Sequence, residues 1–191
     1  FGLAEIISGY EREKKEEWIK ADLRWSKVMP SLRDLRESSW PMARGTVTGF
    51  FAGTLPGVGA TIASFLSYGI ERRLSKEPEK FGKGAIAGVA GPETANNAVT
   101  GAAFVPMLSL GIPAGGTSAV LMGALIMFGL QPGPTLFRDA PGVVWGLIAS
   151  MYIGNVMLVI INVGFIPAIV YIMDRIKPYL SMTILLLAVC G

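Results

Sequence analysis

Two short turns rich in glycine and proline stand inside stretches of chain that carry no charged residue. The first is residues 53–59 (GTLPGVG) and the second is residues 111–116 (GIPAGG). Proline lacks a backbone donor and glycine adopts positive φ, so a straight helix is disfavoured at both places. A helix that starts at such a break offers free N–H groups to an anion, and the released carbonyls suit a cation. The two turns therefore predict a binding site built largely from backbone, the alternative being kinks that serve close helix packing.

Side chains near the turns could complete this site. The adjacent amides Asn96 and Asn97 can donate to a carboxylate or accept from a cation, and interhelical hydrogen bonding is the equally weighted alternative. Glu93 could hold a coupling cation, or it could be the first-turn acid of a helix that starts at residues 91–94 (GPET). We expect substrate-binding residues at Thr54, Pro56, Gly57, Gly59, Asn96, Asn97, Gly115, Gly116 and Thr117, and coupling-ion residues at Gly53, Glu93, Gly111 and Ser118.

Several other classes of site are not supported by the residues. The chain has no histidine and one cysteine, Cys190, which excludes a Cys/His zinc site within it and the usual general base of hydrolases. No Lys-Ser or Lys-Thr pair follows residues 53–59, so this turn is not a nucleotide-binding loop. We therefore expect no enzyme activity, no cofactor and no metal site, and the net charge of +3 does not indicate a nucleic-acid partner.

The distribution of charge indicates an all-α integral membrane protein. Hydrophobic residues make up 51% of the chain, and no Asp, Glu, Lys or Arg occurs in residues 45–70, 94–137 or 140–173. A membrane-spanning helix needs about 20 apolar residues. Lys and Arg gather instead in residues 11–44, which hold nine, and in residues 71–83, which hold five. Because short cytoplasmic loops collect Lys and Arg, both flanks of residues 45–70 should lie in the cytoplasm.

A segment that begins and ends on one side cannot cross once. Each arm beside the turn at residues 53–59 would be roughly 16 Å long, about half of a hydrocarbon core. We therefore expect a re-entrant helical hairpin over residues 45–70 within a multi-span helical bundle.

The remaining segments complete the expected organisation. Residues 1–9 read as the end of a preceding transmembrane helix, residues 10–44 as a cytoplasmic linker, and residues 45–191 as a membrane transport domain. Within it we expect a broken transmembrane helix over 84–130, a transmembrane segment over 143–173 and the start of a truncated helix over 179–191. Either of the two long apolar runs is a broken helix or a span followed by a second re-entrant piece. The missing initial Met and the apolar end suggest a fragment.

The order of these motifs resembles the large permease subunit of the tripartite tricarboxylate transporter family. The matching stretches are residues 44–45, 53–59, 68–73, 78–82, 88–98 (GVAGPETANNA), 108–113 (LSLGIP), 129–137 (GLQPGPTLF) and 150–155 (SMYIGN). One departure is Ala114, where the family often has glycine. The resemblance places the chain in the second half of a longer, multi-pass permease of the bacterial inner membrane, whose halves are inverted repeats.

The same resemblance implies a function and partners. Such permeases take up citrate or other small di- and tricarboxylates, driven by a Na⁺ or H⁺ gradient. They work with a small membrane subunit and a periplasmic solute-binding protein, and membrane lipid surrounds them. From the residues alone, a passive channel or a structural membrane subunit is the alternative, and it predicts that flux depends on neither a binding protein nor an ion gradient.

Overall fold

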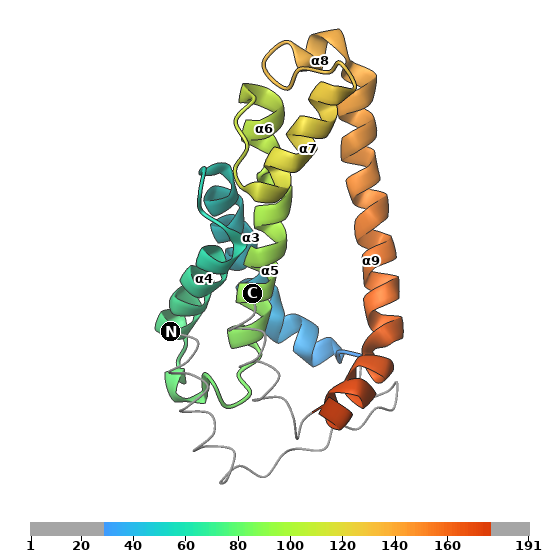
Figure 1. Ribbon diagram of the computed structural model, residues 1–191. Coiled ribbons are helices and arrows are strands. Elements are labelled where there is room, and N and C mark those ends of the chain that lie inside the picture. Colours follow the sequence, from blue (N-terminus) through green and yellow to red (C-terminus); the bar gives the residue numbers. More distant parts are fainter. Residues whose placement is uncertain (1–28, 177–191) are drawn as a thin grey trace. The chain divides into compact units, whose positions relative to one another are not determined.

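A computed structural model describes residues 29–176 of the 191-residue chain, and these residues form helices and connecting segments without strands. The segments expected at residues 1–9 and 179–191 lie outside the described residues. In chain order the elements are α3 (Leu32–Thr54), α4 (Ala60–Leu74), a 3₁₀ turn η1 (Pro78–Lys80), α5 (Ala87–Ala102), α6 (Phe104–Leu110), α7 (Gly116–Met127), α8 (Leu136–Asp139) and α9 (Pro141–Ile176) (Figure 1).

The chain divides into two compact units. The described part of one unit is residues 30–151, and that of the other is residue 29 with residues 152–176. The unit boundary falls within α9, whose stretch Pro141–Met173 contains a strongly apolar part with a mean hydropathy of 2.5 that is not buried. Among the described helices this is the one long and apolar enough to cross a membrane. The transmembrane segment expected over 143–173 is thus one continuous helix, which Gly154 and Asn155 do not break.

Helices α3 and α4 form the hairpin expected around residues 53–59. The start of α3 is fixed by a reciprocal capping box, in which Asp34 N donates to Ser31 Oγ and Ser31 N donates to Asp34 Oδ2. The helix ends at Thr54, the turn passes through Gly57 with φ of 83°, and α4 begins at Ala60. The last part of the expected linker over residues 10–44 is therefore helical, because the capping box starts a helix that continues into the apolar segment.

Helices α3 and α5 pack closely and run in the same direction, through a row of small residues. A Cβ added to Gly45 would collide with the carbonyl oxygen of Gly91. One added to Gly53 would come within 2.8 Å of Val99 Cα and of Ala102 Cβ. Two helix backbones can approach this closely only where side chains are absent. For Gly53, which we expected at a coupling-ion site, the structure shows a packing role at this helix interface.

The first part of α5 corrects one expectation. The helix begins at Ala87 rather than at residues 91–94, and Pro92 lies inside it. Proline has no N–H, so the Gly88 carbonyl loses its usual helical donor. This part of α5 contacts α4, where the Ser64 hydroxyl is shared between the Ala60 carbonyl at 3.0 Å and the Pro92 carbonyl at 3.3 Å. The Gly-Pro pair therefore marks close packing within a helix already under way.

The long apolar run over residues 84–130 is broken at two places. Helix α5 continues into α6 through an irregular turn at Ala103, and α6 ends at Gly111 in the left-handed conformation with φ of 70°. Residues 111–115 then return alongside α6, and α7 starts beside the α5–α6 junction before it runs back toward α8 (Figure 1). Within this run the structure therefore has a kinked helix, α5–α6, followed by a separate short helix, α7. Met107, Leu108, Leu125, Leu136 and Val144 form the core that holds this arrangement.

Candidate functional site

The two Gly/Pro turns contact each other. Gly57 N, at the tip of the α3–α4 hairpin, donates a hydrogen bond of 3.0 Å to the Ala114 carbonyl in the returning segment. The two turns are far apart in the sequence. Helices that pack on α5 and α6 hold both of them in place. The contact brings together the start of α4 and the start of α7, the two helix ends whose N–H groups we expected to bind an anion.

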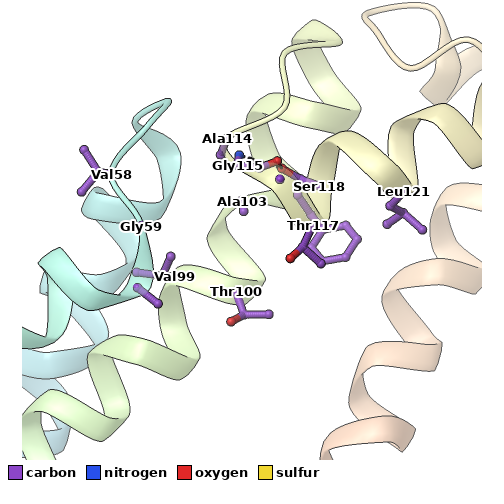
Figure 2. Close-up of a pocket in the computed structure, with 13 residues that line it drawn as sticks. Val58, Gly59, Val99, Thr100, Ala103, Ala114, Gly115, Thr117, Ser118 and Leu121 are labelled. Carbon is purple, nitrogen blue, oxygen red and sulfur yellow. Dashed lines mark hydrogen bonds between the residues drawn. The ribbon is translucent and has the colours of Figure 1, made fainter. Parts of the chain in front are cut away.

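A cavity of about 270 Å³ lies beside this contact. Its wall has three parts, from the hairpin tip, the α5–α6 junction and the start of α7 (Figure 2). The lining residues are Val58, Gly59, Ala60, Val99, Thr100, Ala103, Phe104, Ala114, Gly115, Gly116, Thr117, Ser118 and Leu121. The volume suits a small organic molecule near the lower end of the usual range for ligand pockets.

The start of α7 gives the cavity its polar character. Gly115 N donates to Ser118 Oγ at 2.9 Å, and Ser118 Oγ donates in turn to the Gly115 carbonyl at 2.8 Å. The N–H groups of Gly116 and Thr117 have no partner in the part of the chain that the structure describes. Free first-turn N–H groups and the positive end of the helix dipole favour a negative charge.

The first turn of α4 also has free donors, and one of them, on Ala60, belongs to a residue of the cavity wall. Within residues 29–176 the N–H groups of Ala60 and Thr61 have no partner, whereas those of Ile62 and Ala63 bond to the Gly59 carbonyl at 3.1 and 3.3 Å. Gly59 and Ala60 both line the cavity. Donors from two helices thus border one small space, which is an arrangement that can bind the oxygens of a carboxylate.

Five of the residues expected at the site line this cavity: Gly59, Gly115, Gly116, Thr117 and Ser118. The sequence analysis missed the polar residue Thr100, which lies on the α5 wall close to the start of α7 (Figure 2). Its position four residues after Asn96 puts it on the same helix face, so helical spacing from the amides was the signal that could have found it.

The expected polar residues Thr54, Asn96 and Asn97 lie outside this cavity. Thr54 Oγ1 donates back to the Phe51 carbonyl at 2.8 Å, and Asn97 Nδ2 donates to the Glu93 carbonyl at 3.1 Å. Asn96 lines a second cavity of about 390 Å³ between α4 and α5, together with Thr61, Ser64, Phe65, Tyr68, Gly88 and Pro92. The two amides of adjacent residues therefore face different surroundings.

The other expected residues also have defined places. Pro56 and Glu93 are exposed in the described part of the chain. Gly57 serves the turn, because its φ of 83° and its hydrogen bond to Ala114 require a residue without a Cβ and with an N–H. Gly111 ends α6, and a Cβ there would come within 2.7 Å of the Pro132 carbonyl oxygen.

None of the residues that line the cavity is charged. Charged residues lie instead at the end of the α3–α4 hairpin that is opposite its tip. There Arg44 Nε and Nη2 donate to the two carboxylate oxygens of Glu71 at 2.7 and 2.6 Å. The Glu71 side chain is 1% exposed and that of Arg44 is 36% exposed. The hydrogen bond to Glu71 raises the pKa of Arg44 above its ordinary value. This ion pair joins the middle of α3 to the last turn of α4. In the described residues no cluster of His, Cys, Asp and Glu could hold a metal ion.

Comparison with known proteins gives a consistent result over the whole chain. The model of the family described as "Tripartite tricarboxylate transporter TctA family" matches residues 1–191. Two similar proteins come from Agrobacterium vitis. The "Uncharacterized 52.8 kDa protein in TAR-I ttuC' 3'region" is 47% identical over 167 residues, which are 87% of this chain and 33% of that protein.

The second relative is the "Uncharacterized protein in TAR-II ttuC' 3'region", which is 52% identical over 118 residues, or 62% of this chain and 49% of that protein. The chain thus spans a third to a half of the length of these relatives. No solved structure matches it.

Proposed function

The chain belongs to the tripartite tricarboxylate transporter TctA family, and from this premise we propose that it is part of a secondary permease that takes up citrate or another small di- or tricarboxylate. The observation that carries the proposal is the contact between the two Gly/Pro turns beside a cavity bordered by the N-termini of α4 and α7. A carboxylate there would accept hydrogen bonds from backbone N–H groups. Such a site binds the anion through the fold itself and not through a charged side chain.

The proposed substrate site uses the residues that line the cavity. Gly116 and Thr117 would donate their free N–H groups to a carboxylate, and Thr100 and Thr117 would add hydroxyl groups. Gly59 would let the substrate approach the start of α4, because no side chain covers the backbone there. Asn96 and Asn97 remain candidates for the rest of the site, since the full-length permease contributes residues that this chain does not contain.

The absence of a cationic side chain from the wall bears on coupling. Two or three carboxylates in a membrane need compensating positive charge, and within the described residues the cavity wall holds no Lys or Arg. We propose that a coupling cation, Na⁺ or H⁺, supplies part of it. Carbonyl oxygens at Gly111, Ile112 and Pro113, which accept no hydrogen bond within residues 29–176, are the proposed ligands for Na⁺, and Glu93 is the proposed proton site.

The proposal includes the setting of the transporter. The uncharged segments 45–70, 94–137 and 140–173 suit a multi-pass protein, and we place it in the bacterial inner membrane with the α3–α4 hairpin re-entering from the cytoplasm. The family name indicates an assembly of three components, and the proposed partners are a small membrane subunit and a periplasmic solute-binding protein. No nucleic-acid partner is proposed.

A pair of glycine substitutions on one helix tests the site. A Cβ at Gly116 or at Gly123 would meet no atom within 4 Å. The described residues therefore leave room for the start of a side chain at both positions. Gly116 lines the cavity and Gly123 does not. In the full-length complex, Gly116→Leu should raise the KM for carboxylate uptake at least tenfold, because the new side chain occupies the cavity. Gly123→Leu is the matched control. Equal KM values for the two variants would place the substrate elsewhere.

Uptake into vesicles that contain the full-length complex distinguishes a permease from a channel. Uptake should require the solute-binding protein and should respond to an imposed Na⁺ or H⁺ gradient, each applied separately. Flux that runs down the substrate gradient alone, with neither requirement, would identify a passive channel and would overturn the proposed coupling.

A further inference from the structure

The first part of α3, residues 32–43, exposes an apolar face that packs on nothing in the described chain. Leu32 is 86% exposed, Leu35 49% and Met42 43%. At 3.6 residues per turn these three side chains fall within about 80° of one another around the helix. Exposed Ser39 lies among these side chains around the helix. The buried residues of this part of the helix are Ser38, about 40° from Met42, and Pro41, about 100° from it. The apolar face therefore adjoins the side by which the helix packs on the protein and extends away from it.

Charged and aromatic residues border this face. Trp40 is 72% exposed and adjoins the apolar residues on one flank. Arg36 lies between Trp40 and Leu32 around the helix, and it has no acidic partner among the described residues. Arg33 differs, because its Nε donates to Glu37 at 2.8 Å. Apolar residues with a Trp and a free Arg at their edge are typical of helices that lie in a membrane interface.

The place of this segment in the fold agrees with that setting. The uncharged stretch starts at Gly45, directly after Arg44, and Arg44 is joined to Glu71 where α4 reaches Arg72 and Arg73. Residues 30–83 hold eight Lys and Arg against five Asp and Glu, and all of these lie outside residues 45–70. The hairpin tip lies ten residues beyond Gly45 along α3, or about 15 Å deeper. Residues 32–43 thus stand at the boundary between the charged end and the apolar body.

We propose that residues 32–43 bind along the surface of an anionic lipid bilayer, with Leu32, Leu35 and Met42 among the acyl chains and Arg36 at the lipid phosphates. Pro41 interrupts the helical hydrogen bonds where this surface segment gives way to the part that packs on α5. Figure 1 shows the first part of α3, in blue, at a slant to α5. The occupant is lipid and not another protein segment, since a Trp and a cation without an acidic partner in residues 29–176 flank a narrow apolar face.

Spin labels on the full-length permease in vesicles test this placement. Leu35→Cys and Glu37→Cys, in a background without other cysteines, put labels on the apolar and the charged side of one helical turn. In vesicles that contain phosphatidylglycerol, the label at position 35 should be relaxed more by oxygen than by a water-soluble nickel chelate. The label at position 37 should show the reverse. Nickel access at 35 equal to that at 37 would place the face in water, and low access of both reagents at 35 would place it against protein. Either result would overturn the proposal.

A second pair of variants tests whether Arg36 binds anionic lipid headgroups. Arg36→Gln in phosphatidylglycerol vesicles should raise nickel access to the label at position 35 by at least twofold. Arg33→Gln, which removes an arginine already paired with Glu37, is the matched control and should change it less. The same access for both variants, and for vesicles of phosphatidylcholine alone, would contradict a role for anionic headgroups.

Discussion

Replacing Gly49 by alanine should separate the two helices that support the hairpin. Gly49 lies at the centre of the α3–α5 contact, where a Cβ would collide with the Ala95 carbonyl oxygen and come within 2.8 Å of Ala95 Cα and of Ala98 Cβ. Two of these three obstacles are backbone atoms, which cannot rotate away. The helices must therefore move apart, and overpacking of this kind costs about 1–3 kcal/mol.

The measurement is the free energy of unfolding of the full-length permease in mixed micelles, titrated with a denaturing detergent. Gly69→Ala on α4 is the matched control, because a Cβ there meets nothing within 4 Å. It should leave stability unchanged or raise it by up to about 1 kcal/mol, through the better helix propensity of alanine. If Gly49→Ala is as stable as Gly69→Ala, the close α3–α5 contact does not exist in the membrane and the placement of the hairpin tip loses its support.

Three further predictions follow from the same structure. Arg44→Met should destabilise the permease by roughly 2–3 kcal/mol in the micelle assay, less than a fully buried pair because water reaches the arginine, and adding Glu71→Leu should restore part of the loss. Gly57→Ala should cost about 1–2 kcal/mol because φ is 83°, whereas Gly59→Ala, with φ of −74° and open space around it, should cost less than half of that. Hydrogen bonds from the capping serine lower the pKa of Asp34, so its stabilisation of the helix start is complete above the ordinary pKa of a carboxyl group and is lost as pH falls through the lowered pKa. Amide-exchange protection of the first turn of α3 should show this acid loss, and Asp34→Asn should remove the pH dependence.

Residue types alone predict the two helix breaks and the long apolar helix, because each of these features has a local cause. The turn at residues 53–59 and the break at residues 111–116 are present where glycine and proline occur, since proline removes a donor and glycine permits the positive φ found at Gly57 and Gly111. The helix over 143–173 follows from a long run without charge. Membership of the TctA family was also visible in the order of the motifs.

Local signals failed where packing decided the outcome. Pro92 looked like a helix start, and α5 runs through it because contacts with α3 and α4 stabilise the helix more than a lost hydrogen bond destabilises it. Gly53 has a packing role that its sequence context does not reveal, since its neighbours on α5 leave no room for a Cβ, and its place at a coupling-ion site stays a prediction. Thr100 was missed although it follows Asn96 by one helical turn, because that spacing gains meaning only once the cavity wall is known.

The sequence by itself determined where the chain is apolar, where its helices break and which end of the hairpin carries charge, because these depend on composition and on the φ preferences of single residues. Only the tertiary structure decided which breaks meet. The hydrogen bond from Gly57 to Ala114, the cavity beside it and the return of residues 111–115 toward the α5–α6 junction all join segments distant in sequence. Such contacts depend on how whole helices pack, and spacing along the chain does not encode them.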